Sequence, residues 1–78
     1  MTFIVYSKKN CPFCDKAKQL LELTEQKHVI YTLDEDFTKE EFCAEFGANS
    51  TFPRIVKDTK LIGGTHDLVR IFQEQKII

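Results

Sequence analysis

Two cysteines separated by two residues are the part of this sequence best suited to chemistry. Cys11 and Cys14 stand in the run Cys-Pro-Phe-Cys, directly after the apolar segment Phe3 to Tyr6. Pro12 suits the first position of a helix, where its missing N–H breaks no hydrogen bond. Cys11 is therefore predicted at the helix N-cap and Cys14 one turn inside. Side chains three apart on a helix have Cβ atoms about 5–6 Å apart, close enough for a disulfide. The pair indicates thiol–disulfide exchange.

The two cysteines are expected to differ in reactivity. Exchange needs a thiolate on an accessible sulfur. Cys11 is the candidate nucleophile, because a sulfur at a helix N-terminus can accept backbone N–H bonds and faces the positive end of the helix dipole, with Lys8 nearby. We expect its pKa to lie below the ordinary value of a thiol. Cys14 is expected to be more enclosed and to act as the resolving thiol, which attacks a mixed disulfide formed on Cys11.

A metal site is the alternative interpretation of the same pair. A Cys-x-x-Cys unit is half of many zinc sites, and Cys43, His28 and His66 are available to complete one. These three residues fall on different predicted elements, whereas a tetrahedral site is normally completed by a second close pair of ligands. Exchange is therefore favoured, with no metal ligand assigned. Cys43 is predicted to be a small buried hydrophobe beside Phe42 and Phe46.

The apolar pattern of the first half predicts how the cysteines are positioned. Thr2 to Tyr6 is rich in β-branched and aromatic residues and predicts a strand buried on both faces. An amphipathic helix follows from Pro12 to about Glu25, then a second strand from Val29 to Leu33. This spacing implies parallel strands with a right-handed crossover. The cysteines then lie at the carboxyl end of the first strand, where open α/β sheets usually carry their sites.

The second half predicts a helix, a hairpin and a last helix. Thr38 and Glu41 form a capping box between Phe37 and Phe42, so a helix is expected to start there and to end at Gly47. Two antiparallel strands follow, from Arg54 to Lys57 and from Lys60 to Gly63, around a turn at Asp58 and Thr59. A final helix is expected from about His66 to Gln75. The expected fold class is α/β, with a four-stranded mixed sheet (a parallel βαβ unit plus an antiparallel hairpin) and three helices.

Length and composition limit the possible organisation. The chain has 78 residues, 42% hydrophobic content, seven Phe and two Tyr, which allows one domain, residues 1–78, around one core. No apolar run is long enough for a membrane span, and Met1 to Val5 lacks the features of a signal peptide. Three cysteines do not make the disulfide framework of a secreted domain. We expect a cytoplasmic monomer with no membrane or nucleic-acid partner.

Charge is unevenly distributed although the formal net charge is only −1. The first 18 residues hold four lysines against one acidic side chain, Asp15. Residues 19–50 hold eight acidic side chains against two lysines. Such a field favours anionic ligands near Cys11. Solvated surface lysines would give the same pattern; the neighbouring cysteines favour the first interpretation.

Three segments together resemble the glutaredoxins, small members of the thioredoxin fold. They are Tyr6 to Cys14, Thr51 to Pro53, and Ile62 to Leu68, and the match extends over nearly the whole chain. The resemblance implies a thioredoxin fold and a glutathione-dependent oxidoreductase that reduces protein disulfides and glutathione mixed disulfides. Cys11 and Cys14 would be its catalytic pair and its redox-active disulfide. Glutathione would be the reducing co-substrate, with no bound cofactor. Ribonucleotide reductase is a client that the resemblance implies, although no residue of this sequence points to it in particular.

The resemblance also assigns a role to Pro53. On general grounds its peptide bond would be trans, since about 5–6% of X–Pro bonds in folded proteins are cis. In the glutaredoxin pattern this proline is cis and packs beside the cysteines. That arrangement leaves the main chain of Phe52 to pair with a bound peptide. Phe52 departs from the Val common at this position, which narrows the groove or adds a stacking surface.

The glycine pair near the last helix carries the other half of the implied glutathione site. Gly63 and Gly64 alone indicate no more than a flexible strand end. Followed by Thr65, His66 and Asp67 at a helix start, they make an anion site from backbone N–H groups. Glutaredoxins hold the γ-glutamyl end of glutathione there, with a side chain such as Asp67 nearby. His66 departs from the usual Asp or Ser, and a solvated histidine is the simpler interpretation.

The opposite end of glutathione is expected at the basic side of the cysteine turn. Lys8 would meet the glycyl carboxylate, as its match in the family does, with Arg54 beside the proline as a second cation. Tyr6 and Phe13 flank the cysteine turn and are candidates to line the substrate groove.

Three alternatives stay open. The first is a glutaredoxin-like redoxin reduced by thioredoxin reductase, although such relatives lack the Gly-Gly-x-x-Asp segment at Gly63 to Asp67. The second is a module for an iron–sulfur cluster or metal, against which Pro12 argues, since cluster-binding relatives often have a small residue there. The third is an interaction domain with inert thiols.

Overall fold

A computed structural model describes residues 2–78, which form four strands and three helices. In chain order the elements are β1 (Phe3–Ser7), α1 (Pro12–Leu23), β2 (His28–Thr32), α2 (Lys39–Phe46), β3 (Arg54–Lys57), β4 (Lys60–Gly63) and α3 (Thr65–Glu74). The strands make one mixed sheet in the order β2-β1-β3-β4. β1 is parallel to β2 and antiparallel to β3, and β3 and β4 form the antiparallel hairpin. The predicted fold class is confirmed.

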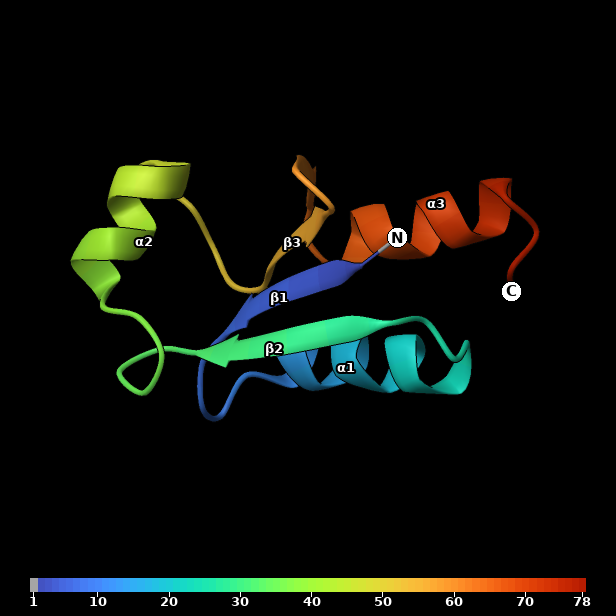
Figure 1. Cartoon of the computed structure of the whole chain (residues 1–78), viewed down its shortest axis with the longest axis horizontal. Helices are drawn as coiled ribbons and strands as arrows, with labels where there is room; N and C mark the ends of the chain where they lie inside the picture. The colour runs from blue at the N-terminus through green and yellow to red at the C-terminus, as the bar shows by residue number, and fades with distance from the viewer. Residues whose placement is uncertain (1) are drawn as a thin grey trace.

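β1 is a central strand whose two faces differ in burial. Phe3, Val5 and Ser7 are buried, whereas Ile4 and Tyr6, which point to the other face, are half-buried. The prediction of burial on both faces is therefore correct for one face only. The reason is the placement of the helices: α1 and α3 cover one face together, while α2 lies beyond the carboxyl ends of β1 and β2 (Figure 1).

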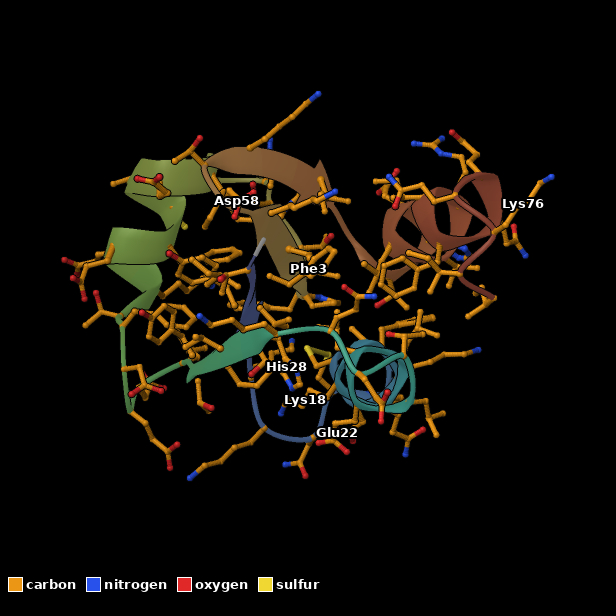
Figure 2. The ribbon with its side chains drawn as sticks, turned by 45° about the vertical axis from the view of Figure 1, so that its right-hand side comes forward. Phe3, Lys18, Glu22, His28, Asp58 and Lys76 are labelled. Atoms are coloured by element: carbon orange, nitrogen blue, oxygen red, sulfur yellow. A yellow bond between two sulfur atoms is a disulfide. The ribbon has the colours of Figure 1, made fainter. Side chains whose placement is uncertain are left out.

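The core lies between the sheet and the pair of helices α1 and α3. Phe3 and Phe72 meet there edge to face, with ring centroids 5.7 Å apart. Figure 2 shows Phe3 inside the layers and Lys76 at the periphery. The other buried members of this core are Val5, Ala17, Leu21, Ile55 and Leu68. Burying a large apolar side chain contributes about 1.5–3 kcal/mol, so this face anchors β1 and α1, the two elements that hold the cysteines.

Local hydrogen bonds decide where α1 ends and α3 begins. α1 ends at Leu23, two residues before the predicted Glu25, because the Thr24 hydroxyl donates to Leu20 O at 2.7 Å and Glu25 adopts a left-handed φ of 56°. α3 begins at Thr65, one residue before the predicted start at His66. Across residues 2–78, no helix combines the length and apolar character needed to cross a bilayer.

α2 follows the predicted start signal. The Thr38 hydroxyl accepts from Glu41 N at 3.1 Å, and the Glu41 carboxylate accepts from Thr38 N at 2.9 Å. This reciprocal pair is the predicted capping box. The helix runs to Phe46 and Gly47 follows with φ of 100°, as the glycine predicts.

Candidate active site

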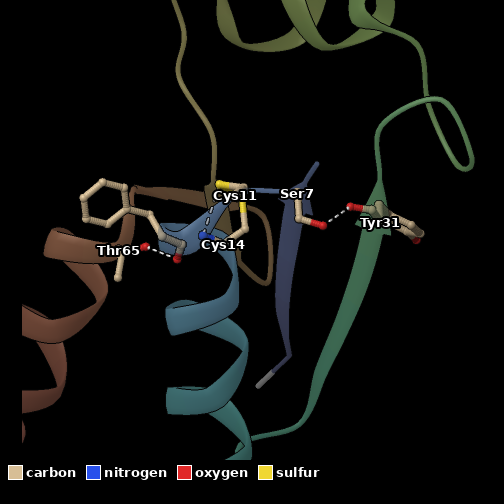
Figure 3. The surroundings of a disulfide bond; sticks show 6 residues. Ser7, Cys11, Cys14, Tyr31 and Thr65 are labelled. Carbon is tan, nitrogen blue, oxygen red and sulfur yellow. Dashed lines mark hydrogen bonds between the residues drawn. A yellow bond between two sulfur atoms is a disulfide. The ribbon is translucent and has the colours of Figure 1, made fainter. Parts of the chain in front are cut away.

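Cys11 and Cys14 form a disulfide at the N-terminus of α1 (Figure 3), with their Cα atoms 5.2 Å apart. Cys11 is the N-cap residue, and its Sγ accepts a hydrogen bond from Cys14 N at 3.2 Å. Both predicted positions are confirmed. A sulfur that accepts a backbone N–H at the positive end of a helix is one whose ionised form is stabilised.

The two cysteines differ only slightly in exposure in this disulfide form. Cys14 is fully buried, as predicted, and Cys11 has 6% of its surface exposed. The accessible sulfur expected at Cys11 is thus largely covered here, because the bond to Cys14 draws it onto the first helical turn. The small exposed fraction still lies on Cys11, the residue expected to be the nucleophile.

Two side-chain hydrogen bonds that the sequence did not predict fix the position of the cysteine turn (Figure 3). The fully buried Ser7 hydroxyl donates to Tyr31 O at 3.0 Å and holds β1 to β2 just before the turn. The Thr65 hydroxyl donates to Phe13 O at 2.8 Å and ties the start of α3 to the first turn of α1. A serine ending an otherwise apolar strand was the only sequence signal for the first bond.

A groove of about 440 Å³ lies where α1, the segment before β3 and the start of α3 meet, and Phe13, which stands between the two cysteines in the sequence, lines it. Seven of the eight residues predicted to bind glutathione line this groove: Phe13, Phe52, Pro53, Gly64, Thr65, His66 and Asp67. Thr51 and Arg54 line it as well. The eighth, Lys8, does not line the groove directly. Its Nζ lies 5.5 Å from the centre of the Phe52 ring, at the groove's border. The structure thus brings the predicted residues together from three distant segments.

The segment before β3 has the geometry that the family pattern implies. The Phe52–Pro53 peptide bond is cis and Pro53 is buried. Among residues 2–78, the main-chain N–H and C=O of Phe52 have no hydrogen-bond partner. The buried Nε of Arg54 is likewise unpartnered. Unpaired buried donors are costly, so this side of the groove offers donors suited to an anionic or peptide ligand.

Asp67 has a structural task at the start of α3. Its Oδ2 accepts from Gly64 N at 3.0 Å, and its Oδ1 lies 3.1 Å from Arg70 Nη2. The side chain expected to contact a ligand therefore caps the helix in this state. The free donors for an anion are the remaining first-turn N–H groups, those of Thr65, His66 and Asp67, which have no acceptor within the helix.

Two sequence expectations need correction. Tyr6 does not line this groove; it packs against α2, with its ring centre 5.0 Å from that of Phe46. Cys43 is half-buried rather than buried, because α2 lies beyond the end of the sheet with only one side packed. Among the described residues, no three His, Cys, Asp or Glu side chains gather as they would around a metal.

The disulfide at a helix N-terminus, the cis peptide bond before Pro53 and the four-stranded mixed sheet are the features that the resemblance to glutaredoxins implied. The glutaredoxin family model aligns with residues 3–62. The chain belongs to the glutaredoxin family. Its paired cysteines at disulfide distance make it a thiol–disulfide oxidoreductase. The thioredoxin fold expected from the resemblance is confirmed by the structural relatives below.

Curated relatives agree along most of the chain. Glutaredoxin 1 of Rickettsia typhi is 38% identical over 81 residues, covering 97% of this chain and 75% of the relative. Glutaredoxin 3 of Escherichia coli K12 is 33% identical over 64 residues, covering 82% and 77%. Among solved structures, reduced E. coli glutaredoxin superposes with a TM-score of 0.81 at 25% identity and full coverage of both chains. A buckwheat glutaredoxin–glutathione complex superposes with a TM-score of 0.79 at 22% identity, covering 96% and 71%.

Proposed function

We propose that this glutaredoxin uses glutathione to reduce protein disulfides and glutathione mixed disulfides. The observation that carries the proposal is the groove, in which seven of the predicted residues come together from three segments, among them Phe13 of the cysteine turn. Its volume of about 440 Å³ suits a tripeptide-sized ligand. The buckwheat relative of the same fold is a glutathione complex, which supports the same ligand for this chain.

The proposed orientation of glutathione follows from where the donors lie. Its γ-glutamyl carboxylate would accept from the first-turn N–H groups of Thr65 and His66 at the positive end of α3. Its cysteinyl main chain would pair with Phe52, whose N–H and C=O are free. Its glycyl carboxylate would lie between Lys8 and the unpartnered Nε of Arg54. The glutathione sulfur then reaches Cys11.

With a glutathione mixed disulfide, one cysteine is sufficient. The Cys11 thiolate attacks the glutathione sulfur, the substrate S–S bond breaks, and the departing protein thiolate takes up a proton. A second glutathione thiolate then attacks the mixed disulfide on Cys11. Glutathione disulfide leaves, and Cys11 returns as a thiolate.

With a protein disulfide, both cysteines are needed. The Cys11 thiolate attacks one substrate sulfur, and the other substrate sulfur leaves as a thiolate and is protonated. Cys14 gives up its proton and attacks Cys11 Sγ, and the second substrate sulfur leaves and takes up that proton. Two electrons have passed to the substrate, and the Cys11–Cys14 disulfide is reduced again by two glutathione molecules, which leave as glutathione disulfide.

The test is a comparison of Cys11→Ser with Cys14→Ser in both reactions. Cys11→Ser should abolish both reactions. Cys14→Ser should keep the reduction of a glutathione mixed disulfide and lose that of a protein disulfide. Cys43→Ser is the matched control, because Cys43 is a half-buried thiol on α2 outside the groove, and it should behave as wild type. Full activity of Cys11→Ser would refute the proposal.

The choice of reductant is tested separately. Reduced glutathione should regenerate the dithiol form at a far higher rate than thioredoxin reductase with its electron donor. The reverse result would identify the chain as a glutaredoxin-like redoxin that is reduced by thioredoxin reductase. We place the activity in the cytoplasm, on a monomer of one domain, where a dithiol can stay reduced. Ribonucleotide reductase, which needs a dithiol at each turnover, is one client class within this proposal.

A further inference from the structure

A second cavity, of about 320 Å³, lies between α2 and the carboxyl ends of β1 and β2, the region at the left of Figure 1. We name it the acidic aromatic pocket. Its walls are five aromatic rings and three carboxylates, none of which the proposed reaction uses: Tyr6, Tyr31, Phe37, Phe42 and Phe46, and Asp36, Glu41 and Glu45.

The aromatic walls are packed around Tyr6. Its ring centre lies 5.0 Å from that of Phe46, 5.3 Å from that of Phe37 and 5.5 Å from that of Tyr31. Aromatic rings carry negative charge density on their faces and attract cations placed within about 6 Å. Tyr31 is 37% exposed on the edge strand β2, so the pocket is open to a partner from solvent.

The three carboxylates give the pocket its negative charge. Asp36 accepts from Thr32 N at 2.8 Å and Glu41 from Thr38 N at 2.9 Å, each with one oxygen, while the Glu45 carboxylate has no hydrogen bond to any of the residues that the structure describes. Within residues 2–78, none of the three takes part in an ion pair. Burial raises the pKa of Tyr6, and the carboxylate of Glu45 adds to that effect.

The pocket shares a wall with the groove. Phe42 lines the pocket and Phe52 lines the groove, and their rings stack with centroids 4.3 Å apart. Consider a protein substrate whose cysteine reacts with Cys11 and whose main chain pairs with that of Phe52. Its chain needs to extend only past the stacked Phe42 and Phe52 rings to reach the pocket. Glutathione has one cationic group, the α-ammonium of its γ-glutamyl residue, and the proposed orientation holds that end of the molecule at the start of α3, none of whose residues lines the pocket.

We propose that the acidic aromatic pocket binds an arginine or lysine side chain of the protein substrates, close in space to their reacting cysteine. The inference rests on the proposed function for the identity of the partner as a disulfide substrate. Charge complementarity selects the side chain: three unpaired carboxylates provide the ionic partner, and the rings accept the apolar stem and the cationic head. The pocket thus favours basic protein substrates over neutral ones, without affecting glutathione.

A binding experiment tests the pocket without any catalysis. The probes are the acetylated, amidated tripeptides Gly-Arg-Gly and Gly-citrulline-Gly, titrated into the disulfide form while NMR follows the rings of Tyr6, Tyr31 and Phe46. The arginine peptide should shift these rings, and the isosteric uncharged citrulline peptide should not. Equal shifts from both peptides, shifts confined to other residues, or shifts that follow protein concentration in the absence of peptide would overturn the proposal.

A kinetic experiment tests the link to substrates. Two otherwise identical peptides carry a glutathione mixed disulfide, one with arginine and one with citrulline on each side of the cysteine, and the measured quantity is the ratio of their kcat/KM values. We expect a ratio well above one in the wild type. In Glu41→Gln/Glu45→Gln it should fall by about three- to tenfold, the size of two exposed ionic contributions, since the aromatic rings remain. Glutamine keeps the capping box at position 41.

Glu40→Gln is the matched control, because Glu40 is exposed on the same helix and does not line the pocket. It should keep the wild-type ratio, which separates local contact from a general loss of charge. A ratio of one in the wild type, or an equal fall in the control, would refute the inference. If the wild type reduced neither peptide, the proposed function would fail, whereas the tripeptide titration would still decide whether the pocket binds a cationic side chain.

Discussion

Phe42 of α2 and Phe52, the residue before Pro53, lie ring on ring, with centroids 4.3 Å apart and 14° between their planes. This stack belongs to an aromatic cluster that fixes α2 against the end of the sheet, since Phe42 also meets Phe37 and Phe46 at 5.8 and 5.1 Å. The residue that forms one side of the groove is therefore positioned by a helix that takes no part in the chemistry.

The first prediction is that Phe42→Ala destabilises the protein and loosens the groove. Phe42 is 3% exposed, and replacing a buried Phe by Ala costs about 3–5 kcal/mol. Urea denaturation should show a loss in that range, and the affinity for glutathione should fall because Phe52 loses its stacking partner. The control is Leu23→Ala, at a position 83% exposed on α1, which should change stability by less than about 0.5 kcal/mol. An unchanged midpoint for Phe42→Ala would contradict the assignment.

The parts of the site that the sequence predicted correctly are those set by neighbouring residues. Pro12 and the N-cap position of Cys11 are local to one turn of helix, and Thr38 and Glu41 close their capping box across three residues. Apolar runs, helical apolar spacing, a capping box and a short turn were together sufficient for the order and type of every element in residues 2–78. The cis bond at Pro53 came from family resemblance, because local preference favours trans.

The parts that were missed join residues far apart in the chain. The bond from Thr65 to Phe13 O spans 52 positions, and that from Ser7 to Tyr31 O spans 24. A hydroxyl can form its hydrogen bonds with water, with a turn or with a strand, so the neighbouring residues in the sequence do not predict which partner it takes. Tyr6 was misplaced for the same reason, because which aromatic rings meet it depends on where α2 lies.

The second prediction separates the two glycines before α3. Gly63 has φ of 126°, and a Cβ there would lie 2.8 Å from Asp67 Cγ. Gly63→Ala should therefore cost about 1–3 kcal/mol of unfolding free energy and displace Asp67 from Gly64 N. Gly64 has φ of −103°, and its added Cβ would meet Pro53 O at an ordinary 3.6 Å. Gly64→Ala should fold with wild-type stability or slightly above it. Equal urea midpoints for the two variants would contradict this account.

The third prediction concerns the reduced form of the cysteine pair. Because Cys11 lies at the N-cap of α1 and its sulfur accepts from Cys14 N, its pKa should lie below that of an ordinary thiol. Iodoacetamide should modify Cys11 nearly as fast at pH 6 as at pH 8, whereas an ordinary thiol slows by about tenfold per pH unit. Mass spectrometry of the alkylated protein identifies the site, and Cys11→Ser supplies the control rate. A Cys11 rate that falls tenfold per unit would refute the N-cap argument.

The fourth prediction is a loss of stability at alkaline pH that depends on Tyr6. Burial, the carboxylate of Glu45 and the neighbouring Tyr31 all raise the pKa of Tyr6 above its ordinary value of 10.0, so the folded state holds the phenolic proton more tightly than the unfolded chain does. The contribution is fully present below pH 10 and is lost as the pH rises further, because only the unfolded chain then releases the proton freely. Urea unfolding between pH 8 and pH 11 should show wild type losing stability relative to Tyr6→Phe above about pH 10. Glu45→Gln removes one cause of the shift and should reduce that difference, whereas Glu40→Gln should leave it unchanged. Parallel stability curves for wild type and Tyr6→Phe would show that the Tyr6 proton is not held by the fold.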